Sequence, residues 1–140
     1  MITVTRLDIA DATVMIAGAV AHADKIGVPM CIAITDDAGQ LIAFCRMDGG
    51  KVTSTTIAID KAFTAAAAKK ATHDYGTISQ PGGPTFGISS AIGGRLMIVG
   101  GGLPVIADGA VVGGIGISSG TPAQDIEVAQ AGIDALMKTL

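Results

Sequence analysis

The clearest pattern along the chain lies in residues 93–120, where short runs of aliphatic side chains alternate with glycines. The runs are residues 96–99, 103–106 and 111–117, and an Asp108-Gly109 turn signal separates the last two. Apolar runs bounded by residues that tolerate positive φ are typical of short paired strands. The sequence therefore predicts a β-meander here, and helices elsewhere in the chain must cover it.

Glycines interrupt these predicted strands as well as bounding them. Gly100 to Gly102 precede Pro104, and three further glycines lie within residues 111–117. Glycine weakens a strand unless a bulge or a close neighbour requires the missing side chain. Two explanations stay open: an alanine-rich helix packs tightly on this backbone, or a ligand does. In the second case Gly101, Gly102 and Pro104 are candidate ligand-binding residues.

A second pair of strands is predicted earlier in the chain. Residues 30–35 and 41–46 are rich in aliphatic side chains and are joined by Asp36-Asp37-Ala38-Gly39. Two such runs joined by a short polar loop that contains glycine predict a β-hairpin.

Apolar positions at helical spacing predict three helices. The first begins at Thr5, with Asp8 in its first turn, and the second is alanine-rich and extends to about Ala71. The third begins after Thr121, which suits the N-cap position before Pro122.

The predicted order is helix, two strands, helix, long loop, three strands and helix, within one domain over residues 1–140. Strands joined mostly by tight turns predict a single antiparallel sheet of about five strands with helices packed on it, which is an α+β fold. Residues 72–94 show no clear periodicity. A loop of that length in a compact domain is typical of a binding or mobile segment.

Composition restricts the classes of partner that this domain is expected to bind. Charged residues make up 15% of the chain, hydrophobic ones 49% and aromatic ones 3%, and the net charge is −3. Few surface charges predict apolar subunit contacts and therefore a homo-oligomer. The lack of basic patches and stacking aromatics argues against nucleic acid, and no apolar run approaches the ~20 residues of a membrane span.

The two cysteines and the N-terminus bear on location. Cys31 and Cys45 lie on different predicted strands, and residues 1–11 have neither a basic region nor an apolar core typical of a secretion signal. These features favour free thiols in a reducing cytoplasm. A disulfide between adjacent strands stays open as an alternative.

Familiar catalytic and metal-binding motifs are missing, including a Walker loop, CxxC, HExxH and a nucleophile elbow. No metal site is predicted. His73 and Tyr75 flank Asp74 after the second helix, where they either bind a ligand, a haem iron or a proton, or simply cap the helix. His22 lies on an apolar helical stripe, which is typical of a satisfied buried histidine and less often of a ligand.

Lys61 shares a helical stripe with apolar residues and is predicted to approach the buried side. A buried ammonium must find a carboxylate or carbonyl, or lose its proton. Asp36 and Asp48 are the candidate partners. A structural ion pair is one interpretation, and an electrostatic anchor or a general base is the other.

Arg46, Asp48 and Lys51 surround a Gly49-Gly50 turn just before the second helix. Free backbone N–H groups beside an arginine can hold a carboxylate or a phosphate. Surface charge is the alternative interpretation. Arg95, after the long loop, could serve the same cleft.

Several motifs in a fixed order resemble the GlcG/HbpS haem-binding, or haem-degrading, domain family. They are D-x-x-G at Asp36 to Gly39, RMDGG at Arg46 to Gly50, DKA at Asp60 to Ala62, GGGLPV followed by DG and VVGGIGISSG, and D-x-x-V-A at Asp125 to Ala129. The resemblance covers nearly the whole chain.

The resemblance implies a profilin-like fold, with a five-stranded antiparallel sheet flanked by helices, that assembles into dimers or larger oligomers. It also implies haem as a cofactor, with His22 and His73 as candidate iron ligands. Some family members are fused to a corrinoid adenosyltransferase, and many are encoded among genes for the catabolism of small organic acids.

Three functional hypotheses follow. The first is a haem or tetrapyrrole binder that is accessory to a catabolic pathway. The second is a cofactor-free isomerase, lyase or hydrolase, in which Arg46 or Arg95 holds a substrate carboxylate while Lys61, His73 or Tyr75 transfers a proton. The third is an oligomeric structural or accessory subunit.

Overall fold

The computed structural model describes all 140 residues, which form four α-helices, two short 3₁₀ helices and four strands. The helices are α1 (Ile9–Ile26), α2 (Ser54–Ala67), α3 (Thr72–Ile78) and α4 (Pro122–Met137), with the 3₁₀ helices η1 (Ile88–Ser90) and η2 (Ile92–Gly94). The strands are β1 (Cys31–Asp36), β2 (Leu41–Arg46), β3 (Gly102–Ala107) and β4 (Ala110–Ser118).

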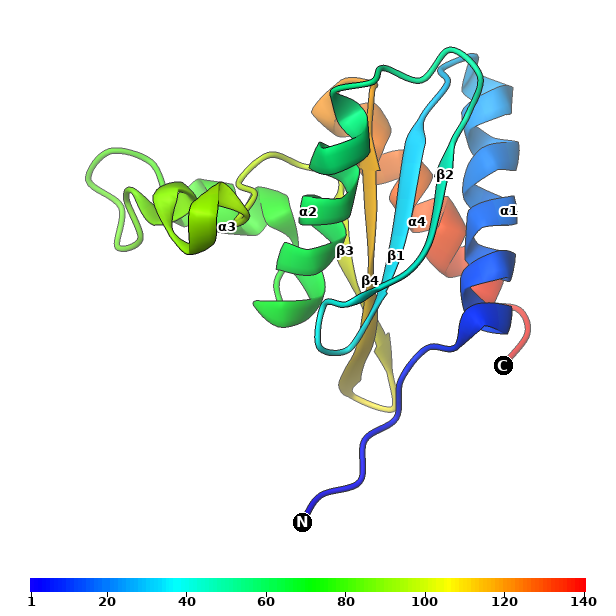
Figure 1. The fold of residues 1–140 in the computed structure, drawn as a ribbon, viewed down its shortest axis with the longest axis horizontal. Helices are drawn as coiled ribbons and strands as arrows, with labels where there is room; N and C mark the ends of the chain where they lie inside the picture. The colour runs from blue at the N-terminus through cyan, green and yellow to red at the C-terminus, as the bar shows by residue number, and fades with distance from the viewer.

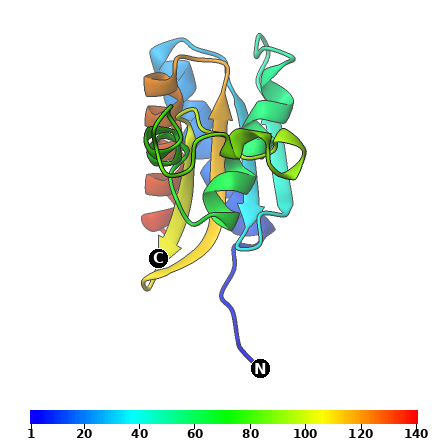
Figure 2. The ribbon, with the colours of Figure 1, turned by 90° about the vertical axis from the view of Figure 1, so that its left-hand side faces the viewer.

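The four strands form one antiparallel sheet in the order β2-β1-β4-β3. Helix α2 covers one face of the sheet, and α1 and α4 lie side by side on the other (Figure 1). Helix α3 and the segment after it project away from this body, and the N-terminal residues extend from it as a tail (Figures 1 and 2). The predicted α+β class is confirmed.

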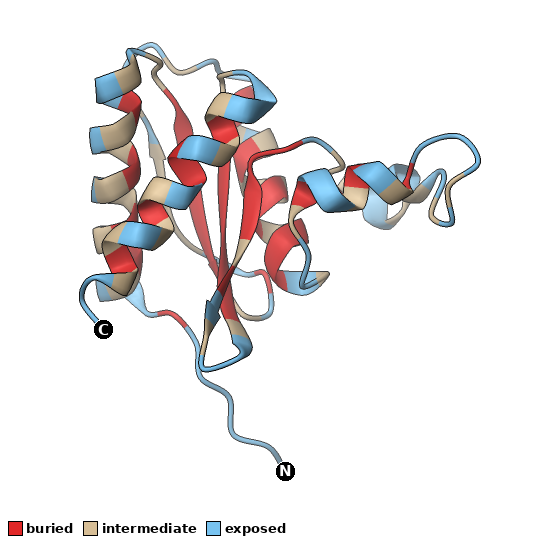
Figure 3. Cartoon of the chain, turned by 180° about the vertical axis from the view of Figure 1, so that it is seen from behind, coloured by how far each residue is buried: buried red, intermediate tan, exposed pale blue.

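The core follows from the alternation of side chains along the strands. Ile32 and Ile34 of β1 pack in the main cluster with α1 and α4, whereas Cys31 and Ala33 pack against α2. Buried residues accordingly concentrate in the strands and on the inner sides of the helices (Figure 3). None of the helices combines the length and the apolar character needed to cross a bilayer.

Helix α2 lies very close to β4 because both surfaces carry small residues. A side chain at Gly114 would collide with the carbonyl oxygen of Ala62, and one at Gly116 would collide with that of Ala58. Glycine in this strand therefore serves close helix packing. Of the two explanations for these glycines, the structure supports the alanine-rich helix.

The prediction of five strands is wrong, because residues 96–99 do not join the sheet. Met97 donates its backbone N–H to Thr64 Oγ1 at 2.9 Å, and the single proton of that hydroxyl is within reach of two carbonyls, that of Asp60 at 2.8 Å and that of Arg95 at 3.1 Å. A side chain of α2 thus satisfies backbone groups that a fifth strand would have paired.

Two predicted boundaries also change, and one helix was not predicted. Helix α1 begins at Ile9 rather than at Thr5, because Asp8 is its N-cap and forms a reciprocal capping box with Asp11. Helix α2 ends at Ala67, and α3 lies within the segment that the sequence predicted as irregular. The hairpin between β1 and β2 is confirmed, as is the Thr121 cap of α4, whose side chain accepts from the Gln124 N–H.

Both cysteines are free. Cys31 pairs with Arg46 across the hairpin, while Cys45 pairs with Ile32, so the two thiols point to opposite faces of the sheet. This register rules out the alternative of a disulfide between them within one chain.

Candidate functional site

A shallow groove runs along the outer surface where α1 meets α4. Its floor is made of the smallest side chains: Gly18 and Ala21 of α1, and Ala131 and Ala135 of α4. A side chain at Gly18 would collide with Cβ of Ala135, so glycine there lets the two helices touch. The result is a flat apolar surface with a volume of about 420 Å³ above it.

His22 lies at the edge of this groove, and its side chain is 27% exposed. Its Nε2 atom is 2.8 Å from Glu127 Oε2, and no other protein group is within hydrogen-bonding distance of the ring. The interpretation of His22 as a satisfied buried histidine is therefore wrong in part, because the ring is satisfied but reaches the surface.

Charged side chains complete the groove. Lys25 of α1 and Lys138, which caps the C-terminal end of α4, contribute ammonium groups, and Asp134 contributes a carboxylate that accepts from Gln130 Nε2 at 2.9 Å. Small apolar side chains together with an imidazole, two lysines and one aspartate suit a partly apolar ligand that carries anionic groups and that an imidazole could ligate.

His73 lines a different, open groove at the base of α3. Its neighbours there include Thr77, Gln80, Val99 and the backbone of Gly100. The volume above this surface is about 520 Å³, and its lining contains no lysine or arginine. The nearest carboxylate to the His73 ring is that of Asp74, at 3.5 Å.

Lys61 is buried in the contact between α2 and the sheet, as predicted, with a side chain 2% exposed. Its ammonium donates to Asp125 Oδ2 at 3.0 Å and to the Ile117 carbonyl at 2.9 Å. Asp125 is 3% exposed and accepts from the Gly120 N–H at 3.0 Å. The prediction of Asp36 or Asp48 as the partner is wrong, because Asp125 at the start of α4 reaches the ammonium instead.

Burial dominates the electrostatics of this pair. Desolvation lowers the pKa of Lys61 and raises the pKa of Asp125, and in each case the attraction of the partner opposes the shift without cancelling it. The pKa of the Cys31 thiol is raised for the same reason. Neither Lys61 nor Asp125 lines the groove that contains His22 or the one that contains His73.

The structure does not bring Lys61, His73 and an arginine together into one cavity. Arg95 stacks on the Phe63 ring at 3.8 Å and pairs with Asp60 Oδ1 at 3.1 Å. Gly101 lies directly over the Lys61 ammonium, where a Cβ would come within 2.8 Å of Nζ. Gly101 therefore accommodates the buried pair.

The remaining predicted residues are dispersed. Gly102 packs against the Lys61 carbonyl, and Pro104 lies in the edge strand β3, where its missing N–H does no harm. Arg46, the last residue of β2, and Asp48 just beyond it are exposed, and Tyr75 is half-buried on α3. Their roles in ligand binding or catalysis stay predictions.

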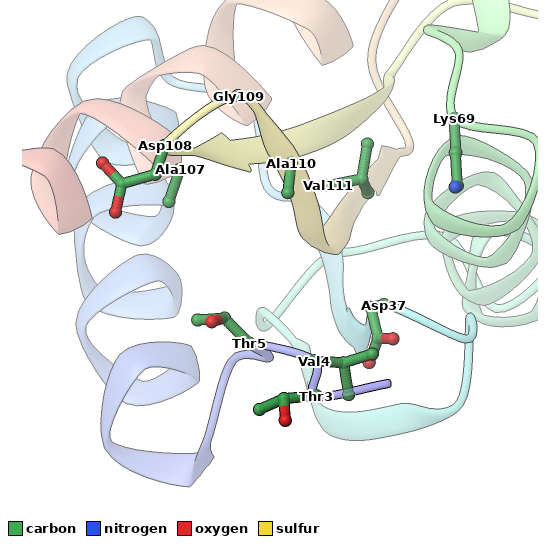
Figure 4. Close-up of a pocket in the computed structure, with 10 residues that line it drawn as sticks. All are labelled: Thr3, Val4, Thr5, Asp37, Lys69, Ala107, Asp108, Gly109, Ala110 and Val111. Carbon is green, nitrogen blue, oxygen red and sulfur yellow. The ribbon is translucent and has the colours of Figure 1, made fainter. Parts of the chain in front are cut away.

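Another groove, with a volume of about 540 Å³, lies between the N-terminal tail and the turn joining β3 to β4. Figure 4 shows Val4 and Asp37 together on one side of it, with Lys69 on the other. Neither histidine lines it, and Asp37 is held by Arg6 Nε at 2.7 Å.

Sequence reasoning missed Lys25 and Lys138 as lining residues of the groove, and Glu127 as the partner of His22. Helical spacing could have indicated them: Lys25 follows His22 by three residues on α1, and Lys138 follows Glu127 by eleven, which is three helical turns. The missing information was that these two helical faces are adjacent.

The chain is an α+β domain, because one four-stranded antiparallel sheet has helices on both of its faces. A histidine lines a groove between two of those helices. A family model described as haem degrading protein HbpS-like matches residues 7–134, so the chain belongs to this family. The resemblance inferred from the sequence motifs is confirmed.

Individual relatives agree with this membership. The chain is 37% identical over 118 residues to the corrinoid adenosyltransferase PduO of Salmonella typhimurium, a match that covers 84% of this chain but 35% of that protein. The crystal structure of Klebsiella pneumoniae protein ORFY has a TM-score of 0.96 at 34% identity, covering 98% of this chain and 94% of that one. A crystal structure described as a PduOC:heme complex has a TM-score of 0.90 at 35% identity, covering 94% and 95%.

Proposed function

We propose that this protein binds haem, or a closely related tetrapyrrole, in the groove between α1 and α4. The observation that carries the proposal is the similarity to the PduOC:heme complex, at a TM-score of 0.90 and 35% identity. The groove adds chemical support, since it joins an apolar floor of small residues to His22 and to two ammonium groups.

The residues of the groove fit the parts of a haem. Imidazole is an established axial ligand of haem iron, and His22 is the candidate for that role. The porphyrin plane would lie on the floor made by Gly18, Ala21, Ala131 and Ala135. Lys25 and Lys138 would pair with propionates. Bound haem would supply a redox-active iron.

The His73 groove is the competing location. It offers an imidazole but no lysine or arginine in its lining. An anionic macrocycle is better served by the groove at His22, which adds Lys25 and Lys138. We therefore assign His22 rather than His73 as the iron ligand.

We also propose that the protein is a homo-oligomer of the cytoplasm. Exposed aliphatic and aromatic side chains occur at scattered sites, among them Ile9 at 61%, Phe86 at 67% and Ile92 at 61% exposure, and subunit contacts would cover them. The two unpaired thiols suit a reducing compartment.

The chain contains only two histidines, so each serves as the matched control for the other. Haemin titrated into the wild-type protein should give a Soret band that saturates at one haem per chain. His22→Ala should abolish the shifted band or weaken binding at least tenfold, whereas His73→Ala should leave both unchanged. Equal spectra and affinities for both variants and the wild type would overturn the proposal.

A further inference from the structure

Glu127 controls the atom of His22 that the proposed function would use. Its Oε2 is 2.8 Å from Nε2, the nitrogen at the outer end of the imidazole. Nε2 of a neutral imidazole that donates its hydrogen to a carboxylate has no lone pair for a metal. In the protein without ligand, the carboxylate therefore occupies the bonding direction of this nitrogen.

We propose that Glu127 is a gate on His22, a lining residue of the α1–α4 groove, and competes with the incoming iron for Nε2. This inference rests on the proposed function. Binding through Nε2 requires that the hydrogen bond to Glu127 break and that the ring proton move to Nδ1 through solvent. Nε2 would then offer a lone pair to the iron, and the Glu127 carboxylate would lie in solvent.

The surroundings of Glu127 allow that movement. Its side chain is 56% exposed, and the His22 ring is its only hydrogen-bond partner in the protein. Water can therefore solvate the displaced carboxylate at little cost. Because exposed ion pairs contribute about 1 kcal/mol or less, removing the competitor should tighten haemin binding by up to about fivefold.

The opposite role makes the opposite prediction. A carboxylate that stayed bonded to Nε2 while Nδ1 held the iron would orient the ring, as second-shell carboxylates do for metal-bound histidines. Loss of Glu127 would then weaken binding. The direction of the change in affinity therefore separates a gate from an orienting partner.

Asp134 provides the matched control. It lies on α4, as Glu127 does, and it lines the α1–α4 groove, but it bonds Gln130 and not His22. Asp134→Ala removes one negative charge near the groove without freeing the imidazole, so any tightening that it causes measures the general effect of charge. Glu127→Ala and Glu127→Gln should both tighten haemin binding more than Asp134→Ala does.

Two measurements decide the proposal. The first is the affinity and association rate of haemin for these three variants, for His22→Ala and for the wild type at one ionic strength. The second is the ¹⁵N spectrum of His22 in the protein without haem, which should show protonated Nε2 in the wild type and a tautomer mixture in Glu127→Ala. Equal or weaker affinity of Glu127→Ala relative to Asp134→Ala would overturn the gate.

Failure of the proposed function gives a different result. If haemin binds the wild type and His22→Ala equally, the assignment of the iron site is wrong, whatever Glu127 does. If His22→Ala loses binding while Glu127→Ala gains none over the control, the iron site stands and the gate does not.

Discussion

The buried pair of Lys61 and Asp125 yields the sharpest prediction about stability. Lys61→Met keeps most of the volume and the unbranched shape of the side chain but removes the ammonium. Asp125 is then left buried, with the Gly120 N–H as its one remaining partner, and the Ile117 carbonyl loses its donor. We expect Lys61→Met to lower the free energy of unfolding by about 3–5 kcal/mol.

The magnitude follows from the geometry. Opposite charges 3.0 Å apart attract by about 5–6 kcal/mol at an effective dielectric constant of ~20. Taking the two ions out of water costs several kcal/mol each, so the intact pair contributes little net stability. Removing one member deletes the attraction while the desolvation cost of the other remains. The single substitution therefore lowers the free energy of unfolding by more than the intact pair contributes.

The pH dependence has a definite sign. Desolvation raises the pKa of Asp125 above its ordinary value of 3.8, and loss of Lys61 removes the largest opposing effect. The folded variant then holds a proton that the unfolded chain has released, so its stability falls as the pH rises above about 4. The difference between Lys61→Met and the wild type should therefore be smaller near pH 4 than at pH 7.

Urea unfolding followed by circular dichroism, at one protein concentration, measures these differences. Lys70→Met is the matched control, because Lys70 is exposed just beyond the same helix, and it should change stability by less than about 0.5 kcal/mol. The double variant Lys61→Met with Asp125→Leu should recover most of the loss. A loss below about 1 kcal/mol in Lys61→Met, or no recovery in the double variant, would refute the reasoning.

Three further predictions concern packing and binding. Gly116→Ala should destabilise the fold by about 1–3 kcal/mol or more in urea unfolding, because the added Cβ has no space against α2. Gly82→Ala is the comparison: its Cβ would lie in open space at a φ of +84°, so it should cost about 1 kcal/mol from backbone strain alone. Thr64→Val should cost about 1–3 kcal/mol by the same assay, since it removes the hydroxyl that accepts from the Met97 N–H and bonds the Asp60 or Arg95 carbonyl. A smaller loss would contradict that role. Lys25→Ala and Lys138→Ala should each weaken haemin binding severalfold in a spectroscopic titration, with a smaller effect at high salt; unchanged affinity would exclude the propionate contacts.

Local patterns predicted well those parts of the fold that depend on local interactions. The hairpin of β1 and β2 could be read from two aliphatic runs around a polar turn, and the cap of α4 from Thr121 beside Pro122. The match between glycines in β4 and alanines in α2 was also visible, because small residues on both sides indicate close approach. The prediction of a strand at residues 96–99 was wrong, since an extended apolar run does not determine which groups will hydrogen-bond its backbone.

The candidate site was much less visible in the sequence. Both histidines were identifiable as candidates, but Glu127 is 105 positions from His22, and nothing in the spacing links them. The partner of Lys61 was assigned wrongly for the same reason, since Asp125 is 64 positions away and lies on another helix. Each of these contacts depends on which helices are neighbours.

The sequence by itself determined helices α1, α2 and α4, the four strands of the sheet, the buried position of Lys61 and the family, but it added a fifth strand and missed α3. Those properties follow from periodicity, turn residues and ordered motifs, all of which are set by near neighbours in the chain. Only the tertiary structure decided that α1 and α4 share one face of the sheet, and therefore that His22 meets Glu127 and lines a groove of small residues. The physical reason is that side chains distant in sequence interact only after the backbone has placed their elements together.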